Sequence, residues 1–380
     1  FTYFMRRASE RHVNWQIVSA DASADEFREA PLLYVASDRE MKLSDAQKAN
    51  IKNYLDQGGL LICVNEGDGD DFTKSVTQLA SELFPAYKFR DRPRDHPIYT
   101  ANFSVTTPAD PIRGLSNGLR ELIVLYPVSD MSWKWQSGGG GFFPKNSPYA
   151  SLANLSLYVT ERADLRYKGE DTWIDAKNEI KPSKSLTLAR IRYDGNWNPE
   201  PGGWQRLANV LHNLDHLDLH IEATDAPQTQ RLAHLTATQS VTLSPQAKAA
   251  IRTYLDNGGM LLLDAAGGSA EAAGSFDALL REMYPSVVIA PLPLDHPIYH
   301  GIRFGGQEIE HVNYRRSPNL EPINIPRLRG ATVNGKLIAI VSYEDLSGGL
   351  VGYPTAGLNG YTPASATELV RNIILWRAEK

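Results

Sequence analysis

The chain of 380 residues contains one cysteine, Cys63, and a single thiol excludes an internal disulfide and any metal site built from several cysteines. No apolar run approaches the roughly 20 residues that a membrane-spanning helix needs. The formal net charge is −5, and lysine and arginine are scattered along the chain. The sequence therefore has neither the basic field of a general nucleic-acid binder nor a cationic membrane-binding run. What remains is the composition of an ordinary globular protein.

Residues 43–99 repeat at 243–299 with a constant offset of 200 and no gap, and 22 of these 57 positions are identical. The matches include the glycine pair Gly58-Gly59 and the pentapeptide Asp-His-Pro-Ile-Tyr, which begins at Asp95 and again at Asp295. Both kinds of match fall where turns constrain the backbone. The chain is therefore a tandem duplication, and its function has to account for two related domains.

The repeat predicts a first domain over 1–167, a polar linker over 168–185 and a second domain over 186–380. The opening residues 1–7 resemble residues 186–192, and we interpret both as strands. Their offset is 185 rather than 200, so the first copy is shorter before Leu43. We expect that it lacks the first helix, which an apolar stripe from Trp204 to Leu214 predicts in the second copy.

The elements within each copy alternate between helix and strand. Residues 44–56 predict a helix that starts with a capping box and ends before the glycine pair. The apolar runs 60–64 and 260–263 are too short for helices and predict central parallel strands. A second helix follows in each copy. This order predicts two doubly wound α/β domains with mostly parallel, flavodoxin-like sheets.

Ligands of such sheets bind at the carboxyl ends of the strands. Four segments of the second copy should meet there and supply carboxylates, a histidine, aromatic rings and glycines. The predicted ligand-binding residues are Tyr193, Asp194, Trp197, Asp264, Gly267, Gly268 and Ser269, and the candidate catalytic residues are Asp295, His296, Glu344 and Asp345. We expect no cofactor and no bound metal.

The pentapeptide Asp-His-Pro-Ile-Tyr has two interpretations. In the first, Asp295 orients the His296 imidazole, which acts as a base or a ligand. In the second, it is a structural turn whose proline sets the backbone angle and whose Ile-Tyr pair enters the core. Retention in both copies favours the turn.

Two other groups of polar residues suggest sites less strongly. His212, His216 and His220 are spaced by four, but residues 218–221 predict the next strand, so the third histidine should leave the helical face. The acidic segment 65–71 matches no complete calcium loop. We interpret it as a solvated loop.

Several strings resemble the bacterial domain-of-unknown-function 4159 family. The second copy carries Ala-Arg-Ile-Arg-Tyr-Asp-Gly-Asn-Trp from Ala189, then Pro-Glu-Pro-Gly-Gly-Trp from Pro199, Asp-His-Pro at 295–297 and Tyr-Glu-Asp-Leu-Ser from Tyr343. The first copy has related strings at 116–121 and 154–166. The resemblance implies a fold related to class I glutamine amidotransferases and membership among exported or membrane-associated proteins. It implies no established reaction.

Amidotransferase chemistry needs a nucleophile on a strained turn after a strand. Cys63 lies inside an apolar run, and the chain contains neither Gly-x-Cys-x-Gly nor Gly-x-Ser-x-Gly. Glutamine hydrolysis is therefore not expected.

We expect a non-catalytic binding or scaffold protein, with a protein partner or self-association and a small polar or carbohydrate-like ligand. It would belong to an exported or periplasmic assembly; a cytoplasmic location is the alternative. The alternative function is a hydrolase or lyase of a carbohydrate-like substrate, with Asp295 and His296 as base and Glu344 or Asp345 as acid.

Overall fold

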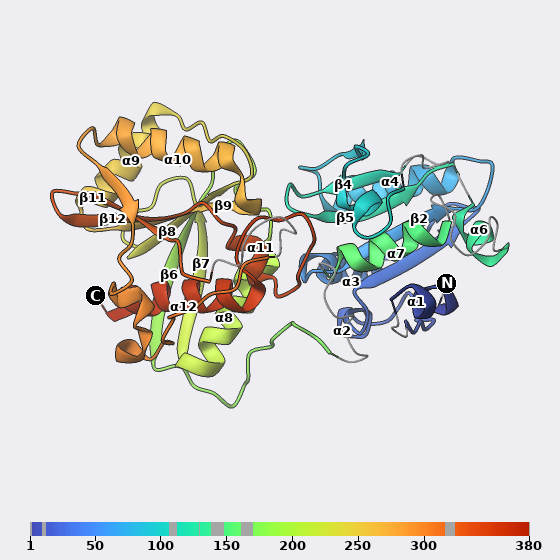
Figure 1. The fold of residues 1–380 in the computed structure, drawn as a ribbon, viewed down its shortest axis with the longest axis horizontal. Helices are drawn as coiled ribbons and strands as arrows, with labels where there is room; N and C mark the ends of the chain where they lie inside the picture. Colours follow the sequence, from blue (N-terminus) through green and yellow to red (C-terminus); the bar gives the residue numbers. More distant parts are fainter. Residues whose placement is uncertain are drawn as a thin grey trace. The chain divides into compact units, whose positions relative to one another are not determined.

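The computed structural model describes residues 2–9, 13–105, 112–128, 130–137, 148–160, 170–315 and 324–379. It divides into two compact units. Unit 1 comprises residues 1–171 together with 353–357, and unit 2 comprises residues 172–352 and 358–380. The division after Asp171 falls inside the segment 168–185. The fold is two tandem α/β units, each built on its own mostly parallel sheet (Figure 1).

The sheet of unit 2 has seven strands in the order β10-β11-β12-β9-β8-β6-β7. Five neighbouring strands, from β12 to β7, run parallel, and β11 pairs antiparallel with both β10 and β12. The strands are β6 (Lys184–Ile191), β7 (Leu217–Thr224), β8 (Leu232–Ala237), β9 (Met260–Ala265), β10 (Val288–Pro291), β11 (Arg329–Val333) and β12 (Lys336–Ser342).

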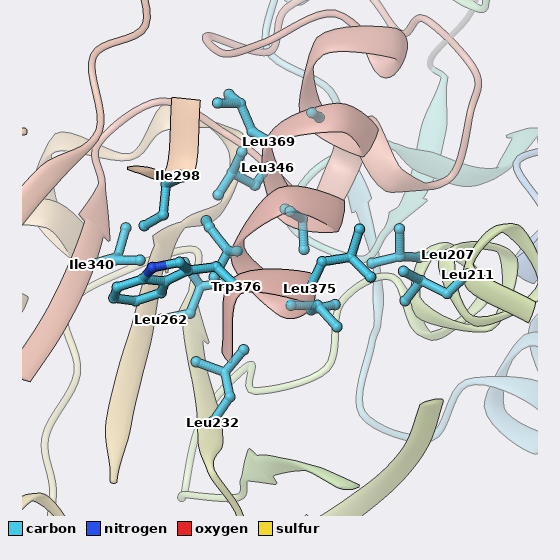
Figure 2. Close-up of a cluster of buried hydrophobic side chains, with 14 of the residues drawn as sticks. Leu207, Leu211, Leu232, Leu262, Ile298, Ile340, Leu346, Leu369, Leu375 and Trp376 are labelled. Atoms are coloured by element: carbon cyan, nitrogen blue, oxygen red, sulfur yellow. The ribbon is translucent and has the colours of Figure 1, made fainter. Parts of the chain in front are cut away.

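Helices cover both faces of this sheet (Figure 1). They are α8 (Pro201–Asp215), α9 (Pro245–Asp256), α10 (Ala270–Met283), α11 (Ser347–Leu350) and α12 (Pro363–Glu379), with 3-10 turns η1 (Ala266–Gly268), η2 (Pro297–Tyr299) and η3 (Gly301–Phe304). One core lies under α9 and α10, and the other lies under α8 and α12. Figure 2 shows the second core, where Leu375 and Trp376 of α12 lie among Leu207 of α8 and Leu262 of β9.

The sheet of unit 1 has five strands in the order β1-β2-β5-β4-β3. The strands are β1 (Leu32–Ser37), β2 (Leu60–Asn65), β3 (Phe89–Asp91), β4 (Arg113–Ser116) and β5 (Glu121–Tyr126). The helices are α1 (Thr2–Ser9), α2 (Ala24–Arg28), α3 (Asp45–Asp56), α4 (Asp71–Leu83), α5 (Pro97–Thr100), α6 (Met131–Ser137) and α7 (Pro148–Tyr158). The order corresponds to β8-β9-β12-β11-β10, so the described residues of unit 1 contain no counterpart of β6 in the sheet.

The shared helix–turn–strand segment forms as its local chemistry predicts. Ser44 caps α3 and forms a capping box with Gln47, and Ser244 caps α9. Gly58 and Gly258 end these helices with φ of 106° and 96°, in the left-handed region that favours glycine. The apolar runs that follow are β2 and β9, and all of their residues are buried. The predicted helix and central strand are confirmed in both copies.

The predicted opening strand of the first copy is wrong, because Thr2–Ser9 form helix α1. Its buried Phe4 and Met5 pack against Ala153 of α7. A helix is favoured there because these apolar side chains then share one face. At an offset of 204, Ile17, Asp21 and Ala22 match Ile221, Asp225 and Ala226. This second alignment places α1 opposite the end of α8, and residues 13–20 opposite β7, rather than opposite β6.

None of the described helices is long and apolar enough to cross a membrane.

Candidate functional site

Two buried aspartates meet at the carboxyl edge of the unit 2 sheet. Asp264 lies near the end of β9, and Asp345 follows the neighbouring strand β12. Both side chains are fully buried. Because parallel strands end at the same edge, the loops after β9 and β12 come together there.

Each aspartate holds the other one's loop. Asp264 accepts hydrogen bonds from the backbone N–H groups of Leu346 and Ser347, both at 3.0 Å. Asp345 accepts one from Gly267, in the loop after β9, at 2.8 Å, and one from Gly348 at 3.0 Å. A carboxylate that accepts from backbone N–H groups satisfies donors that would otherwise be buried without partners. Both carboxylates therefore fix the loop geometry of this edge.

The surroundings of Asp345 shift its protonation. Burial raises its pKa, and the nearby Asp264 carboxylate raises it further. Arg315, whose Nη2 lies 3.8 Å from Asp345 Oδ2, and the two backbone donors lower the pKa but do not cancel the effect of burial. Ionising both carboxylates of a buried pair is unfavourable, because their negative charges repel each other.

A second buried group lies beside this pair, on β6, β8 and α8. The His234 ring packs on the Trp204 ring with a centroid separation of 4.6 Å, and the Arg190 guanidinium lies 5.3 Å from the centroid of the Trp204 ring. His234 Nε2 is 3.9 Å from Asp264 Oδ2. Burial lowers the pKa of His234 to about 4, and Arg190 lowers it while Asp264 raises it. At neutral pH the imidazole is therefore uncharged and can both donate and accept.

Several polar atoms of this group are buried without a hydrogen-bond partner among the described residues. They are Arg190 Nε, Trp204 Nε1, both ring nitrogens of His234, Asp345 Oδ2 and Ser347 Oγ. Each such group costs free energy unless water or a ligand pairs with it. Unlike the bonded carboxylate oxygens, these atoms retain unused hydrogen-bonding capacity.

The loop after β6 supplies aromatic residues to the same region. Tyr193 donates from its hydroxyl to the backbone oxygen of Thr236, at the end of β8, at 3.1 Å. The Arg190 guanidinium donates to the Trp197 backbone oxygen at 3.1 Å and lies 5.9 Å from the Trp197 ring centroid. Asp194 is exposed. The structure thus joins Tyr193 and Trp197 to the carboxyl edge and leaves Asp194 facing solvent.

The remaining predicted ligand residues form the turn after β9. Gly267 and Gly268 adopt φ of 73° and 69°, and a Cβ on Gly268 would lie 2.0 Å from the backbone oxygen of Asn359. Ser269 caps α10 by accepting from the N–H of Ala272. These residues shape the loop by backbone conformation and capping.

Asp295 and His296 belong to a different part of unit 2. His296 Nδ1 accepts from the N–H of Ile298, and its ring packs edge-on against Trp376 of α12. The neighbouring Arg377 donates to the backbone oxygen of Gly258, just before β9 begins. Trp376 therefore lies toward the amino ends of the strands, whereas Asp345 follows a carboxyl end. The same cap recurs at His96 in unit 1, which fits a structural turn.

Glu344, the other candidate acid, pairs with Arg327 at 3.2 Å between Oε1 and Nε. Burial raises the pKa of Glu344, and Arg327 lowers it. The three histidines separate as expected: His212 is on α8, His216 caps it in the left-handed conformation, and His220 is on β7.

Unit 1 does not repeat the polar group. Val64 stands where unit 2 has Asp264, and Tyr34 stands where it has His234. A pocket of about 330 Å³ lies at this edge, and its lining includes Asp38, Glu66 and Asp130. In the described chain no three histidine, cysteine or acidic residues are grouped as a metal site requires.

Sequence reasoning missed Arg190, Trp204 and His234. A usable signal was present, because Arg190 interrupts an apolar strand near its carboxyl end and His234 interrupts one in its middle. A charged or imidazole side chain in a fully buried strand needs a polar neighbour.

The chain matches a protein-family model over most of its length. The domain of unknown function DUF4159 matches residues 1–137, in unit 1, and residues 187–377, most of which lie in unit 2. No curated protein matches the chain.

Proposed function

We propose that this chain, which belongs to the family defined by the domain of unknown function DUF4159, is a non-catalytic binding and scaffold protein. In this proposal, unit 2 holds a small polar ligand at the carboxyl edge of its sheet, and unit 1 serves mainly as a scaffold in an exported or cell-envelope assembly. The resemblance of the sequence to exported and membrane-associated proteins supports the proposed export.

The observation that carries the proposal is the hydrogen bonding of Asp264 and Asp345. Their carboxylates accept four backbone N–H groups and brace the two loops of the edge. A general acid or base has to reach a substrate proton, within about 3 Å. Three of the four carboxylate oxygens are engaged in this way and both side chains are fully buried, which suits a preformed binding site better than proton transfer.

The unpaired atoms of Arg190, Trp204 and His234 define the ligand chemistry. Arginine and the indole supply N–H donors only, whereas neutral His234 supplies one donor and one acceptor. The positive charge of Arg190 favours an anionic or strongly polar group. A small carboxylate or hydroxyl-bearing molecule fits this donor-rich set.

We further infer that both units descend from a class I glutamine amidotransferase-like fold that has lost its nucleophile. Cys63 lies within β2 and is fully buried, and burial raises its pKa, so the thiol stays protonated. Reactive cysteines have lowered pKa values and partial exposure.

Native mass spectrometry of the full chain tests the ligand. We expect a discrete additional mass on the folded chain that is lost on denaturation. His234→Phe should lose this mass while keeping its fold, because phenylalanine can still stack on Trp204. Tyr34→Phe, at the matched position of unit 1, should retain it. A folded chain without additional mass in any preparation contradicts the binding proposal.

The competing proposal for this chain is a hydrolase of a carbohydrate-like substrate. Assays with a panel of glycosides would support it if turnover disappeared in Asp345→Asn or His296→Ala at an unchanged melting temperature. That result would replace the binding proposal.

A further inference from the structure

The strand β1 forms one edge of the unit 1 sheet, whereas its counterpart β8 lies inside the sheet of unit 2. β8 pairs with β9 on one side and with β6 on the other. β1 pairs with β2 in the register in which β8 pairs with β9, since Leu32 faces Leu60 as Leu232 faces Met260. Among the described residues no strand occupies the position beside β1 that β6 fills in unit 2.

Burial reflects this difference. All six residues of β8 are buried, and none of the six residues of β1 is. The matched pair Tyr34 and His234 are 44% and 1% exposed. Residues 13–20, the sequence counterpart of β7, form no strand, and Trp15 and Ile17 there are 75% and 89% exposed. In unit 2, β7 corresponds to residues 13–20; it lies at the edge of the sheet and pairs with β6.

The edge of β1 also lacks the features that protect exposed edges. Native edge strands carry charges, prolines or bulges that discourage pairing with another chain. The other described edges follow this rule: β7 contains Asp218 and Glu222, β10 contains Pro291, and β3 contains Arg90 and Asp91. β1 reads Leu-Leu-Tyr-Val-Ala-Ser, without charge or proline.

We propose that the free edge of β1 binds an extended, largely apolar segment of a partner polypeptide as an added parallel strand. The repeat itself identifies the chemistry of the occupant. In unit 2 the same position holds β6, whose Leu188, Ala189 and Arg190 face Leu232, Ala233 and His234. The partner segment should alternate apolar residues as β6 does. Main-chain hydrogen bonds supply affinity, and side-chain pockets supply selectivity. This proposal concerns unit 1 and is independent of the ligand in unit 2.

A peptide with the sequence of residues 184–192 is the probe, added to the full chain. Hydrogen exchange followed by mass spectrometry compares the amides of β1 with those of β8. When the peptide concentration is about ten times the dissociation constant, we expect hydrogen exchange of the β1 amides to slow by about tenfold. The amides of β8 should not change, because their edge is already paired.

A control peptide carries proline at the positions of Leu188 and Arg190. Proline removes the N–H donors that pairing requires, so this peptide should neither bind nor protect β1. The proposal is overturned if the first peptide fails to bind, or if both peptides protect β1 equally. It is also overturned if β1 is already protected without peptide in a dimer, since a second copy would then be the occupant.

Discussion

Asp264 and Asp345 brace each other's loops: Asp264 accepts from Leu346 and Ser347, and Asp345 accepts from Gly267. The two aspartates lie on neighbouring strands of unit 2, and each bonds the backbone next to the other. The carboxyl edge of this sheet is thus held by side chains, and its shape depends on both carboxylates together.

Asp264→Asn should lower the free energy of unfolding of unit 2 by about 3 kcal/mol, because an amide cannot accept both N–H groups and its own N–H₂ would face a donor. Urea titration measures this loss of unfolding free energy, and calorimetry measures the accompanying change in melting temperature. Asp194→Asn is the control, because Asp194 is exposed and should leave stability unchanged. Equal stability of both variants would show that the backbone bonds to Asp264 are dispensable.

Acid should destabilise unit 2 through His234. Its pKa is lowered from 6.5 to about 4 in the folded state, so the unfolded state binds the proton first as pH falls. The contribution of neutral His234 to the free energy of unfolding is therefore fully present above pH 6.5. It is lost as pH falls toward 4, and the loss amounts to about 3 kcal/mol at most. Intrinsic tryptophan fluorescence in urea follows the unfolding transition at each pH. His234→Phe should flatten this part of the pH profile, and an unchanged slope would assign the acid sensitivity to other groups.

His296→Ala should destabilise unit 2 by about 1 kcal/mol, the usual cost of losing an N-cap side chain. The matched variant His96→Ala should destabilise unit 1 by a similar amount, since His96 caps α5 in the same way. Calorimetry of both variants tests the pair. A melting temperature that does not change in His296→Ala would argue against the structural turn.

Three glycine-to-alanine variants should separate backbone strain from steric overlap. Gly268→Ala combines a φ of 69° with a Cβ only 2.0 Å from Asn359 O, so the loop has to move and unit 2 should lose several kcal/mol. Gly258→Ala has a φ of 96° but open space, and should cost about 1 kcal/mol.

Gly274→Ala is the third variant, inside α10 with nothing near its Cβ, and should stabilise the helix by up to about 1 kcal/mol. Thermal unfolding ranks the three variants. Any other order would show that the loop after β9 adapts more readily than its contacts imply.

Local signals predicted the shared fold elements well. Ser44 and Gln47 predict a capped helix start, and Gly58 predicts its end, because these effects act within a few residues. The same reasoning failed at residues 2–9. Apolar and polar residues there fit either a short strand or a helix, and contacts with Ala153, far along the chain, decide between them.

The candidate site was predictable only in part. Asp264 and Asp345 stood out because each lies at or shortly after the end of an apolar run, but their pairing across two loops involves residues 81 positions apart in sequence. Asp295 and His296 form a conspicuous motif, yet the structure places their turn against Trp376. The hydrophobic periodicity of the sequence assigns a residue to a helix or a strand. It does not show which distant loop packs against that residue.

The sequence by itself determined the duplication, the alternation of helix and strand, the capped helices and the absence of a Gly-x-Cys-x-Gly or Gly-x-Ser-x-Gly motif. Each of these depends on identity at a fixed offset or on neighbours within one or two turns. Only the tertiary structure decided that Arg190, Trp204 and His234 meet, that both aspartates bond backbone, and that β1 is an open edge. These features depend on strand order and register, which long-range packing sets.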